Sequence, residues 1–461
     1  MQQSSSWLTY KGVSVLPLLM AIPLLLLGFS EHWSYDESMT YMNILDSTPL
    51  EIVQYEKYKL ANNHVLNSLY YRWLEDMGAK SLFLFRLPNF LMFFVYFLLI
   101  SRLLKKQEGY QLRHIDQLML YLWPYYIYFA QARGYSLAMV AMLGALIALK
   151  GFVKEGKPQQ LLYLVLLGSL SSLSIFSFIF PFAAMLIVAC LYRFSQVIKS
   201  PLHWLILALT LPVVWYVFDK GQVVSKYDPA IIGRDTLFRG GTLSSLISFL
   251  TLNEFAPREV FLVLKVLVSV TLAPVVFILI RHGKIYIELT VALVSVLLLV
   301  VAHYAFGAMY PLYRGAAYII ILVLLAFTYS NFKNSIFNTL HFSTIILCGL
   351  VYMSYLFYFK SRKSMDDVLA MVASDPGPVL VQDVHPAPHA VNHKRYNDAL
   401  DLDVCVTYDT ACFDRTLDTA KYVICFEDRI AVAGREDEFE LQYRVATFFY
   451  YNKYFYKRKQ R

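Results

Sequence analysis

Charged residues are scarce in this chain. Only 16% of its 461 residues are Asp, Glu, Lys or Arg, whereas a typical soluble domain carries about 25%. Hydrophobic residues make up 58% of the sequence, and the mean hydropathy is +0.49. This balance excludes an ordinary soluble enzyme and predicts an α-helical protein that crosses a membrane several times.

Cysteines and clustered basic residues are also few. The five cysteines include no Cys-x-x-Cys pair, which argues against a structural zinc site. Cys190 and Cys348 fall in apolar runs, whereas Cys405, Cys412 and Cys425 fall in the C-terminal region, where one disulfide remains an open alternative. The net charge of +8 is interpreted mainly as a signal of membrane topology, and nucleic-acid binding is not expected.

The apolar runs have the lengths of membrane-spanning helices and predict about eleven of them. They lie near 12–29, 82–101, 115–131, 135–152, 161–174, 176–192, 201–218, 259–280, 285–305, 314–330 and 336–358. Between 161 and 192 the sequence is compatible with two short helices or one long tilted helix. The first run is not followed by Ala-x-Ala-like processing residues, and the next loop begins with Trp and Tyr, so it is interpreted as a retained anchor rather than a cleaved signal.

Basic residues in the short loops predict the orientation. Lysines and arginines follow the second, fourth, sixth and eighth runs, and such residues are retained on the cytoplasmic side. The N-terminus is therefore expected in the cytoplasm, with loops 30–81 and 219–258 facing outward. The expected organisation is a transmembrane core over 1–360 followed by a small α/β domain over 361–461 outside the cytoplasm.

The C-terminal region has a different composition from the core. Asp375-Pro-Gly-Pro378 is typical of a turn, and Val379–Asp383 and Lys421–Phe426 have the pattern of β-strands. The segment Glu438–Tyr451 contains enough β-branched and aromatic residues for one or two more strands. A small mixed α/β domain is expected.

With this topology, many polar and aromatic residues fall at the outer ends of spans or in outward loops, where they can converge on one face. They are Asp36, Glu37, His64, Arg133, Tyr135, Lys226, Arg234, Arg239, Tyr310, Tyr313 and Arg314. Lys265, near the outer end of its span, is either a functional charge or a lysine that snorkels outward. Ordinary roles stay open for others: Asp36 and Glu37 could be solvated residues at a helix start, and Arg133 could be an interfacial anchor.

Several of these residues lie in ordered motifs. The motifs are Asp36-Glu37 after the first span, Asn63-His64, Leu69–Gly78, Phe85-Arg-Leu-Pro88, Ala132-Arg-Gly-Tyr-Ser136 and Tyr310-Pro-Leu-Tyr-Arg314. Together they resemble the C-type (GT-C) membrane glycosyltransferase superfamily, in its bacterial branch similar to protein O-mannosyltransferases and aminoarabinose transferases (glycosyltransferase family 39-like). The resemblance covers about residues 10–330. Two departures are His64-Val-Leu66, where many relatives have His-Pro-Pro, and Arg314-Gly315, where relatives have Arg-Tyr.

The resemblance implies a reaction at the periplasmic face of a bacterial inner membrane. A sugar would move from a polyprenyl-phosphate donor to a hydroxyl or amine of a glycan, lipid or protein acceptor, with inversion. Asp36 would act as the base and Glu37 as a supporting group, while Arg133 and the basic outward loops would stabilise the departing phosphate. The sequence leaves metal use open, because Asp36 and His64 are suitable ligands for a divalent ion.

The alternative is a polytopic lipid or glycan transporter or flippase. Such proteins commonly contain internal repeats and ionisable residues near the middle of the bilayer. The chain shows no repeat, and its charges gather at the ends of the spans. These observations favour the transferase.

Overall fold

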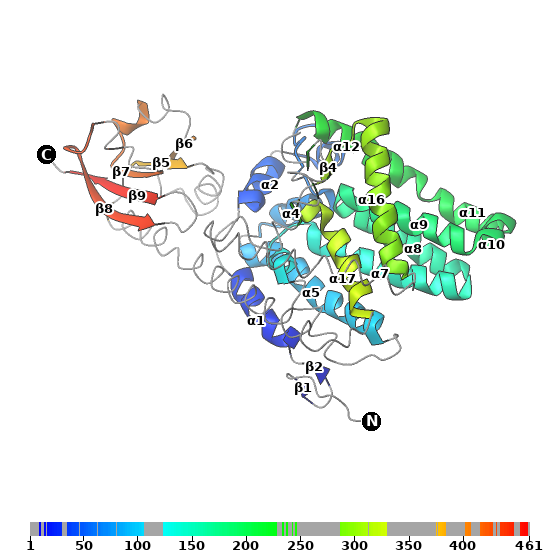
Figure 1. Cartoon of the computed structure of the whole chain (residues 1–461). Helices are drawn as coiled ribbons and strands as arrows, with labels where there is room; N and C mark the ends of the chain where they lie inside the picture. The colour runs from blue at the N-terminus through cyan, green and yellow to red at the C-terminus, as the bar shows by residue number, and fades with distance from the viewer. Residues whose placement is uncertain are drawn as a thin grey trace. The chain divides into compact units, whose positions relative to one another are not determined.

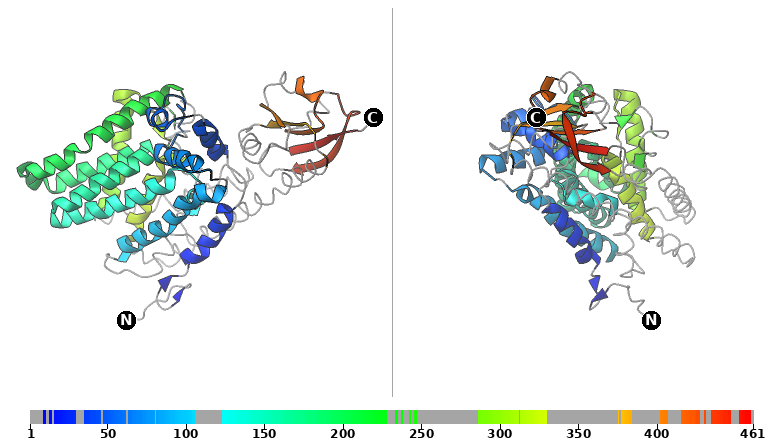
Figure 2. Two further views of the ribbon diagram at one scale, coloured as in Figure 1. Left: turned by 180° about the vertical axis from the view of Figure 1, so that it is seen from behind. Right: turned by 90° about the vertical axis from the view of Figure 1, so that its left-hand side faces the viewer.

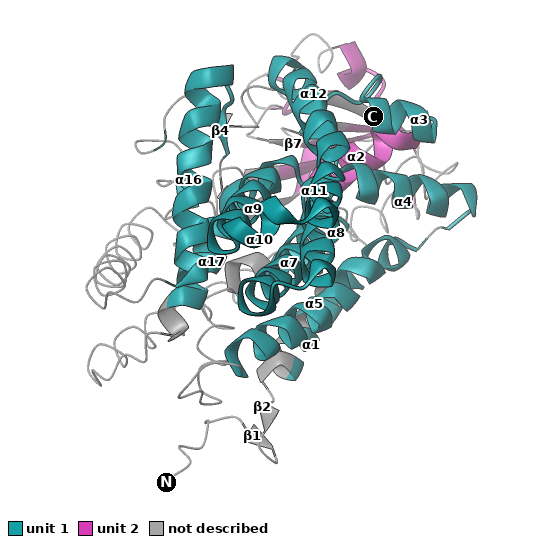
Figure 3. Cartoon of the chain, turned by 90° about the vertical axis from the view of Figure 1, so that its right-hand side faces the viewer, with its two compact units in different colours: residues 1–29, 47–254, 258–352 teal, residues 30–46, 255–257, 353–461 magenta. Residues whose placement is uncertain are grey.

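A computed structural model of the full chain provides the structure. It describes residues 9–10, 13–14, 16–29, 35–45, 47–61, 63–79, 81–105, 123–227, 233–234, 237, 242, 245–246, 286–311, 313–329, 375, 377–383, 402–406, 415–426, 430, 434–446 and 452–459. The chain divides into two compact units, coloured separately in Figure 3. Unit 1 comprises residues 1–29, 47–254 and 258–352, and unit 2 comprises residues 30–46, 255–257 and 353–461.

Unit 1 is built from helices (Figure 1). Its first part contains the β1–β2 hairpin (Thr9–Tyr10 and Val13–Ser14) and helices α1 (Leu16–Gly28), α3 (Pro49–Gln54), α4 (Val65–Asp76) and α5 (Leu82–Lys105). Thr48 and Glu51 form a capping box that starts α3. Four helical stretches in the described part of the chain are long and apolar enough to cross a membrane: 82–105, 135–155, 201–227 and 287–306.

The centre of unit 1 is α7 (Tyr135–Glu155), which is apolar and buried on most sides. The helices and turns that follow it in the chain are α8 (Pro158–Ser174), η2 (Phe176–Phe178), α9 (Ile179–Tyr192), α10 (Phe194–Lys199), α11 (Pro201–Ala208), α12 (Leu211–Tyr227), α16 (Ile287–Phe306), η3 (Tyr313–Ala316) and α17 (Ala317–Tyr329). Helices α7, α8 and α9 pack against one another and run side by side in the left view of Figure 2. Gly168 permits the close packing of α8 on α9, because a Cβ there would overlap the ring of Phe182.

The end of α7 far from Tyr135 is fastened by polar contacts. Arg193 donates through Nε to the Val153 carbonyl (2.8 Å) and also binds the next carbonyl, and Gln196 binds the carbonyl of Gly156. Lys150 forms an ion pair with Glu288, which lies at the start of α16 and has a buried side chain. With 21 residues, α7 is about 30 Å long, so Tyr135 and this polar end lie about one hydrocarbon core apart.

The predicted spans agree with the described helices in most places. Residues 161–192 form two helices, α8 and α9, separated at Ile175, rather than one long helix. The predicted boundary at 218 is wrong, because α12 continues to Tyr227, so the expected outward loop 219–258 begins as a helix. Expected loop 30–81 contains α3, α4 and, in unit 2, α2 (Tyr35–Leu45). The spans at 259–280 and 336–358 lie outside the described residues, as do residues 115–122 of the third span, in which Trp123–Phe129 form a 3-10 helix.

His203 on α11 is buried, with its ring edge-on to Phe152 at 5.6 Å between centroids. Among the described residues, neither ring nitrogen has a hydrogen-bond partner. Because a buried polar atom without a partner costs about 1–3 kcal/mol, we expect His203→Phe to raise the thermal unfolding temperature in detergent. A drop of several degrees would show that this imidazole makes a stabilising polar contact.

Unit 2 contains a five-stranded mixed sheet in the order β6-β5-β7-β9-β8. The strands are β5 (Val379–Asp383), β6 (Leu402–Val406), β7 (Tyr422–Phe426), β8 (Phe439–Ala446) and β9 (Asn452–Arg458). Strands β6, β5 and β7 are parallel, whereas β9 and β8 are antiparallel. The strands predicted at 379–383 and 421–426 are confirmed, and β8 lies within the segment 438–451 where a further strand was expected. Strands β6 and β9 were not predicted, since β9 begins at Asn452, beyond that segment.

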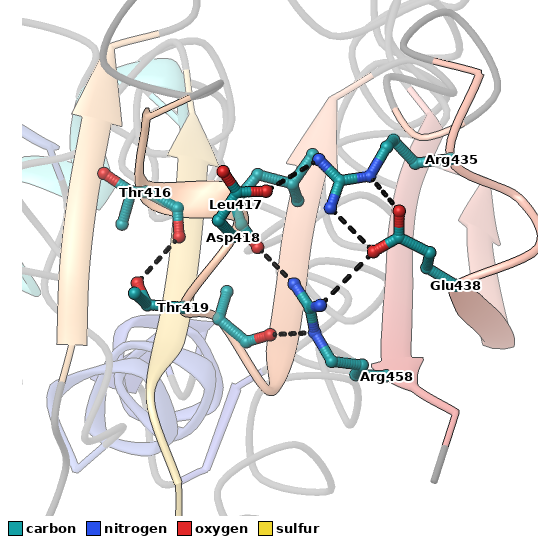
Figure 4. A network of polar contacts seen from close by, with 8 residues as sticks. Thr416, Leu417, Asp418, Thr419, Arg435, Glu438 and Arg458 are labelled. Atoms are coloured by element: carbon teal, nitrogen blue, oxygen red, sulfur yellow. Dashed lines mark hydrogen bonds and ion pairs between the residues drawn. The ribbon is translucent and has the colours of Figure 1, made fainter. Parts of the chain in front are cut away.

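Polar networks hold the connections of this sheet. Arg435 binds Glu438 and Asp418, and Arg458 binds Glu438 and the carbonyl of Ala420 (Figure 4). A second cluster surrounds one carboxylate, since hydrogen bonds from Lys421, Lys457 and Tyr422 hold the pKa of Asp375 well below its usual range.

Cys425 on β7 is a buried thiol in the core of the sheet. The possible disulfide of the C-terminal region therefore does not include Cys425. The side chains of Cys405 and Cys412 lie outside the described residues.

Candidate active site

A tight hairpin precedes α7 and is held by α4. Residues 130–134 connect η1 (Trp123–Phe129) to α7. The carbonyl of Ala132 accepts two hydrogen bonds, from Asn67 Nδ2 and Tyr71 Oη, each at 2.8 Å. Asn67 and Tyr71 are four residues apart and therefore share one face of α4. This double contact determines where the next residue, Arg133, is placed.

Arg133 is a buried cation with 1% of its surface exposed. Its Nη2 lies 3.1 Å from Nε2 of His64, the residue that precedes α4. A guanidinium has only donors and keeps its charge, so Nε2 must be the acceptor. This contact assigns the proton of a neutral His64 ring to Nδ1.

Tyr135, the first residue of α7, is the centre of a cluster that we call the Tyr135 cluster: His64, Arg133, Tyr135 and Arg314. The His64 ring meets Tyr135 edge-on at 5.0 Å between centroids. The guanidinium carbons of Arg133 and Arg314 lie 5.1 Å and 5.6 Å from the centre of the Tyr135 ring. Two cations and an imidazole from three distant parts of the chain thus meet on one ring.

Gly134 makes the hairpin possible for steric reasons. A Cβ at this position would lie 2.6 Å from the carbonyl oxygen of Ser174 and 3.1 Å from Cβ of His64. The φ of −68° is one that any residue adopts, so the constraint is space and not backbone conformation.

We expect Gly134→Ala to lower the free energy of unfolding by about 1–3 kcal/mol, as overpacking against backbone does. Gly221→Ala is the matched control: Gly221 lies inside α12 with nothing within 4 Å of its added Cβ. That change should raise stability by about 0.5–1 kcal/mol, the helix preference of alanine over glycine. Thermal unfolding of both variants measures the contrast, and equal effects would contradict the close approach of Gly134 to Ser174.

Arg314 comes to the cluster on η3, after a short β-ladder. Strand β4 (Tyr310–Pro311) pairs with β3 (Gly233–Arg234), with Arg234 opposite Tyr310. Thr242 Oγ1 donates to the carbonyl of Pro311 at 2.8 Å, and Tyr310 stacks on His303 at 4.5 Å between centroids. This pairing therefore places the backbone of residues 233–234 next to Tyr310 and Pro311, which precede Arg314 in the chain.

The other predicted site residues lie elsewhere or outside the described residues. Lys226 is in the last turn of α12, next to Tyr227. The side chains of Arg234, Arg239, Lys265 and Tyr313 lie outside the described residues.

Asp36 and Glu37 are in the first turn of α2, which belongs to unit 2. Glu37 is fully buried and Asp36 is half-buried. The interpretation of both as solvated helix-start residues is therefore wrong for Glu37.

The fit of a metal ion can be judged from the donor atoms. Among the described residues, no group of three or more His, Cys, Asp and Glu side chains lies close enough to hold one. Nε2 of His64 faces the guanidinium of Arg133 at 3.1 Å. A cation there would face a fixed positive charge, so a metal would have to bind through Nδ1 or displace Arg133.

Two structural residues of the site were not expected from the sequence. Asn67 and Tyr71 position the hairpin through the Ala132 carbonyl. Their spacing of four residues on an amphipathic helix indicates that they share one face. It does not indicate their partner, because Ala132 is 61 residues beyond Tyr71 in the chain.

Comparisons with known proteins give a similar structure but no similar sequence. No protein-family model matches the chain, and no curated protein matches it. A solved structure similar to this chain is the crystal structure of ArnT from Cupriavidus metallidurans bound to undecaprenyl phosphate. The TM-score is 0.36 and the identity 10%, over 96% of this chain and 97% of that chain. Function is therefore inferred from the residues of this chain alone.

Proposed function

We propose that the chain is an integral-membrane glycosyltransferase of the GT-C type. It moves a sugar from a polyprenyl-phosphate donor to an acceptor hydroxyl or amine at the periplasmic face of a bacterial inner membrane. The observation that carries the proposal is the Tyr135 cluster, in which Arg133 and Arg314 both approach the ring of Tyr135. The motifs around Asp36, His64, Arg133 and Arg314, which resemble those of that superfamily, support it.

The Tyr135 cluster suits the leaving group of such a reaction. As the bond from the anomeric carbon to the phosphate oxygen breaks, negative charge develops on the departing polyprenyl phosphate. Fixed guanidinium groups stabilise that charge, and arginine can hold two phosphate oxygens at once. Arg133 is already oriented by His64, so it would lose little freedom when it binds the phosphate. Arg234, Arg239, Lys265, Tyr310 and Tyr313 would complete the donor site, whereas Lys226 lies at the end of α12 beside Tyr227 and is left out of it.

Asp36 is proposed as the base. Its carboxylate would take the proton of the acceptor as the acceptor oxygen or nitrogen attacks the anomeric carbon on the face opposite the phosphate. One bond forms while the bond to phosphate breaks, so the anomeric centre is inverted. Buried Glu37 would orient Asp36 in the first turn of α2. Asp36 is a suitable ligand should the reaction use a divalent ion, which would add charge stabilisation.

Recognition of the phosphate can be tested by binding. Purified protein should bind a polyprenyl phosphate more tightly than the uncharged polyprenol. Arg314→Gln should weaken binding of the phosphate by about 10-fold to 100-fold, the range for hydrogen bonds to charged groups, and leave polyprenol binding unchanged. Arg72→Gln is the control, because Arg72 is paired with Asp76 on the surface of α4. Equal binding of phosphate and alcohol would count against the proposal.

A lipid or glycan transporter is the second candidate. The ion pair of Lys150 with buried Glu288 favours it, since charges within spans often lie on transport paths. However, Lys150 is near the end of α7 and Glu288 is in the first turn of α16. This position is less suited to a substrate path through the middle of the membrane than to a contact that fastens two helices.

A further inference from the structure

Two lysines approach one tyrosine ring at the end of α12. Nζ of Lys59 lies 4.6 Å from the centre of the Tyr227 ring, and Nζ of Lys226 lies 5.8 Å from it. Lys59 comes from the segment between α3 and α4, and Lys226 from the last turn of α12. The ring attracts each ammonium group, but the two like charges repel each other. An anion bound by both lysines would offset that repulsion.

The neighbouring lysines show a different arrangement. Lys57 forms an ion pair with Glu51 at 3.1 Å, and Lys220 forms one with Asp219 at 2.8 Å. In the part of the chain that the structure describes, neither Lys59 nor Lys226 has a carboxylate within ion-pair distance. Among the described residues, therefore, no carboxylate neutralises these two charges.

The face of α12 that leads to Lys226 is suited to a lipid chain. Leu211, Trp215, Phe218, Gln222 and Lys226 are all exposed, and their spacing places them on one face of the helix. The face is apolar at its start, with Trp215 72% exposed, and becomes polar and then cationic. From residue 211 to residue 226 the helix rises about 22 Å, which is about half the thickness of a bilayer with its headgroups.

We propose that Lys59 and Lys226 bind the phosphate of an anionic phospholipid whose acyl chain lies along Trp215 and Leu211. The site uses residues other than the Tyr135 cluster and does not depend on glycosyl transfer. A lipid bound there would contact two parts of unit 1, α12 and the segment before α4. These two parts already pack together through Tyr55, Val65 and Val224. The hydroxyl of Tyr216 donates to the carbonyl of Val53 at 2.7 Å in the same region. A bound lipid should therefore stabilise the contact of α12 with the segment before α4.

Lipid binding to the purified full-length protein in detergent tests the proposal. Native mass spectrometry would compare phosphatidylglycerol, phosphatidylcholine and inorganic phosphate. Phosphatidylglycerol should bind most tightly, and Lys59→Gln/Lys226→Gln should weaken it roughly 30-fold, the effect of removing two lysines near an anionic headgroup. The matched control Lys57→Gln/Lys220→Gln should weaken it by less than about threefold, since those lysines are already paired.

Three results would overturn the proposal. The two double variants could lose affinity equally, which would indicate general surface charge. Phosphatidylcholine could bind as tightly as phosphatidylglycerol, or inorganic phosphate could compete at the same concentration as the lipid, which would exclude an anionic lipid as the occupant. If the double variant does not fold, the two single variants serve instead, and each should lose affinity about fivefold.

Placement of the acyl chain has its own readout. Trp215 is the exposed tryptophan of the proposed lipid face. Phosphatidylglycerol brominated on its acyl chains should quench part of the tryptophan fluorescence, and Trp215→Phe should remove that part. Unchanged quenching in Trp215→Phe would contradict the path along α12.

Discussion

Replacing Arg133 by lysine is expected to lower kcat/KM for sugar transfer about 100-fold or more, the effect of losing a fixed donor for a developing oxyanion. The guanidinium of Arg133 approaches Nε2 of His64 and the ring of Tyr135 at the same time. A lysine has one compact ammonium group and cannot reproduce both contacts. Burial also disfavours its charged form, so part of the positive charge would be lost.

Arg193→Lys is the matched control for that change. Arg193, which follows α9, donates to two carbonyls at the opposite end of α7, so its replacement also removes a guanidinium that contacts this helix. It should lower stability slightly and leave transfer nearly unchanged. Activity assays at equal amounts of folded protein compare the two variants. Equal losses of kcat/KM would show that Arg133 acts only by supporting α7.

Much of the Tyr135 cluster could be predicted from the sequence. The basic loops predict which ends of the spans face outward, and that topology alone groups His64, Arg133, Tyr135 and Arg314 on one face. Their contacts could not be predicted in the same way. His64 and Arg133 are 69 residues apart in the chain. Whether they touch depends on how α4 packs on the hairpin, which no local pattern specifies.

The errors in the fold have local causes. Residues 219–222 (Asp-Lys-Gly-Gln) are polar and include a glycine, and this composition is typical of a loop. They remain helical because Val224 packs against Tyr55 and Val65, so tertiary contact outweighs propensity. Strand β6 was missed because Asp401 and Asp403 lower the β-propensity of a short segment. Its pairing with β5 supplies the stabilisation that its sequence lacks.

Asp36→Asn is expected to have the largest effect on catalysis. The change keeps the size of the side chain and removes its charge and basicity, and a positioned general base contributes about 10²-fold to 10⁴-fold. Asp36 is half-buried in the first turn of α2, where asparagine is also tolerated, so folding should be retained. Glu37→Gln is a less direct test, because Glu37 is fully buried and its change would disturb packing as well.

The most direct test of the account is sugar transfer from a panel of radiolabelled polyprenyl-phosphate sugars, measured in membranes that contain wild-type protein or Asp36→Asn at equal expression. Membranes without the protein provide the background. We predict transfer of at least one sugar by the wild type and its loss, by about 100-fold or more, in Asp36→Asn. Equal transfer by both proteins would contradict the role of Asp36, and no transfer above background from any donor would contradict the glycosyltransferase itself.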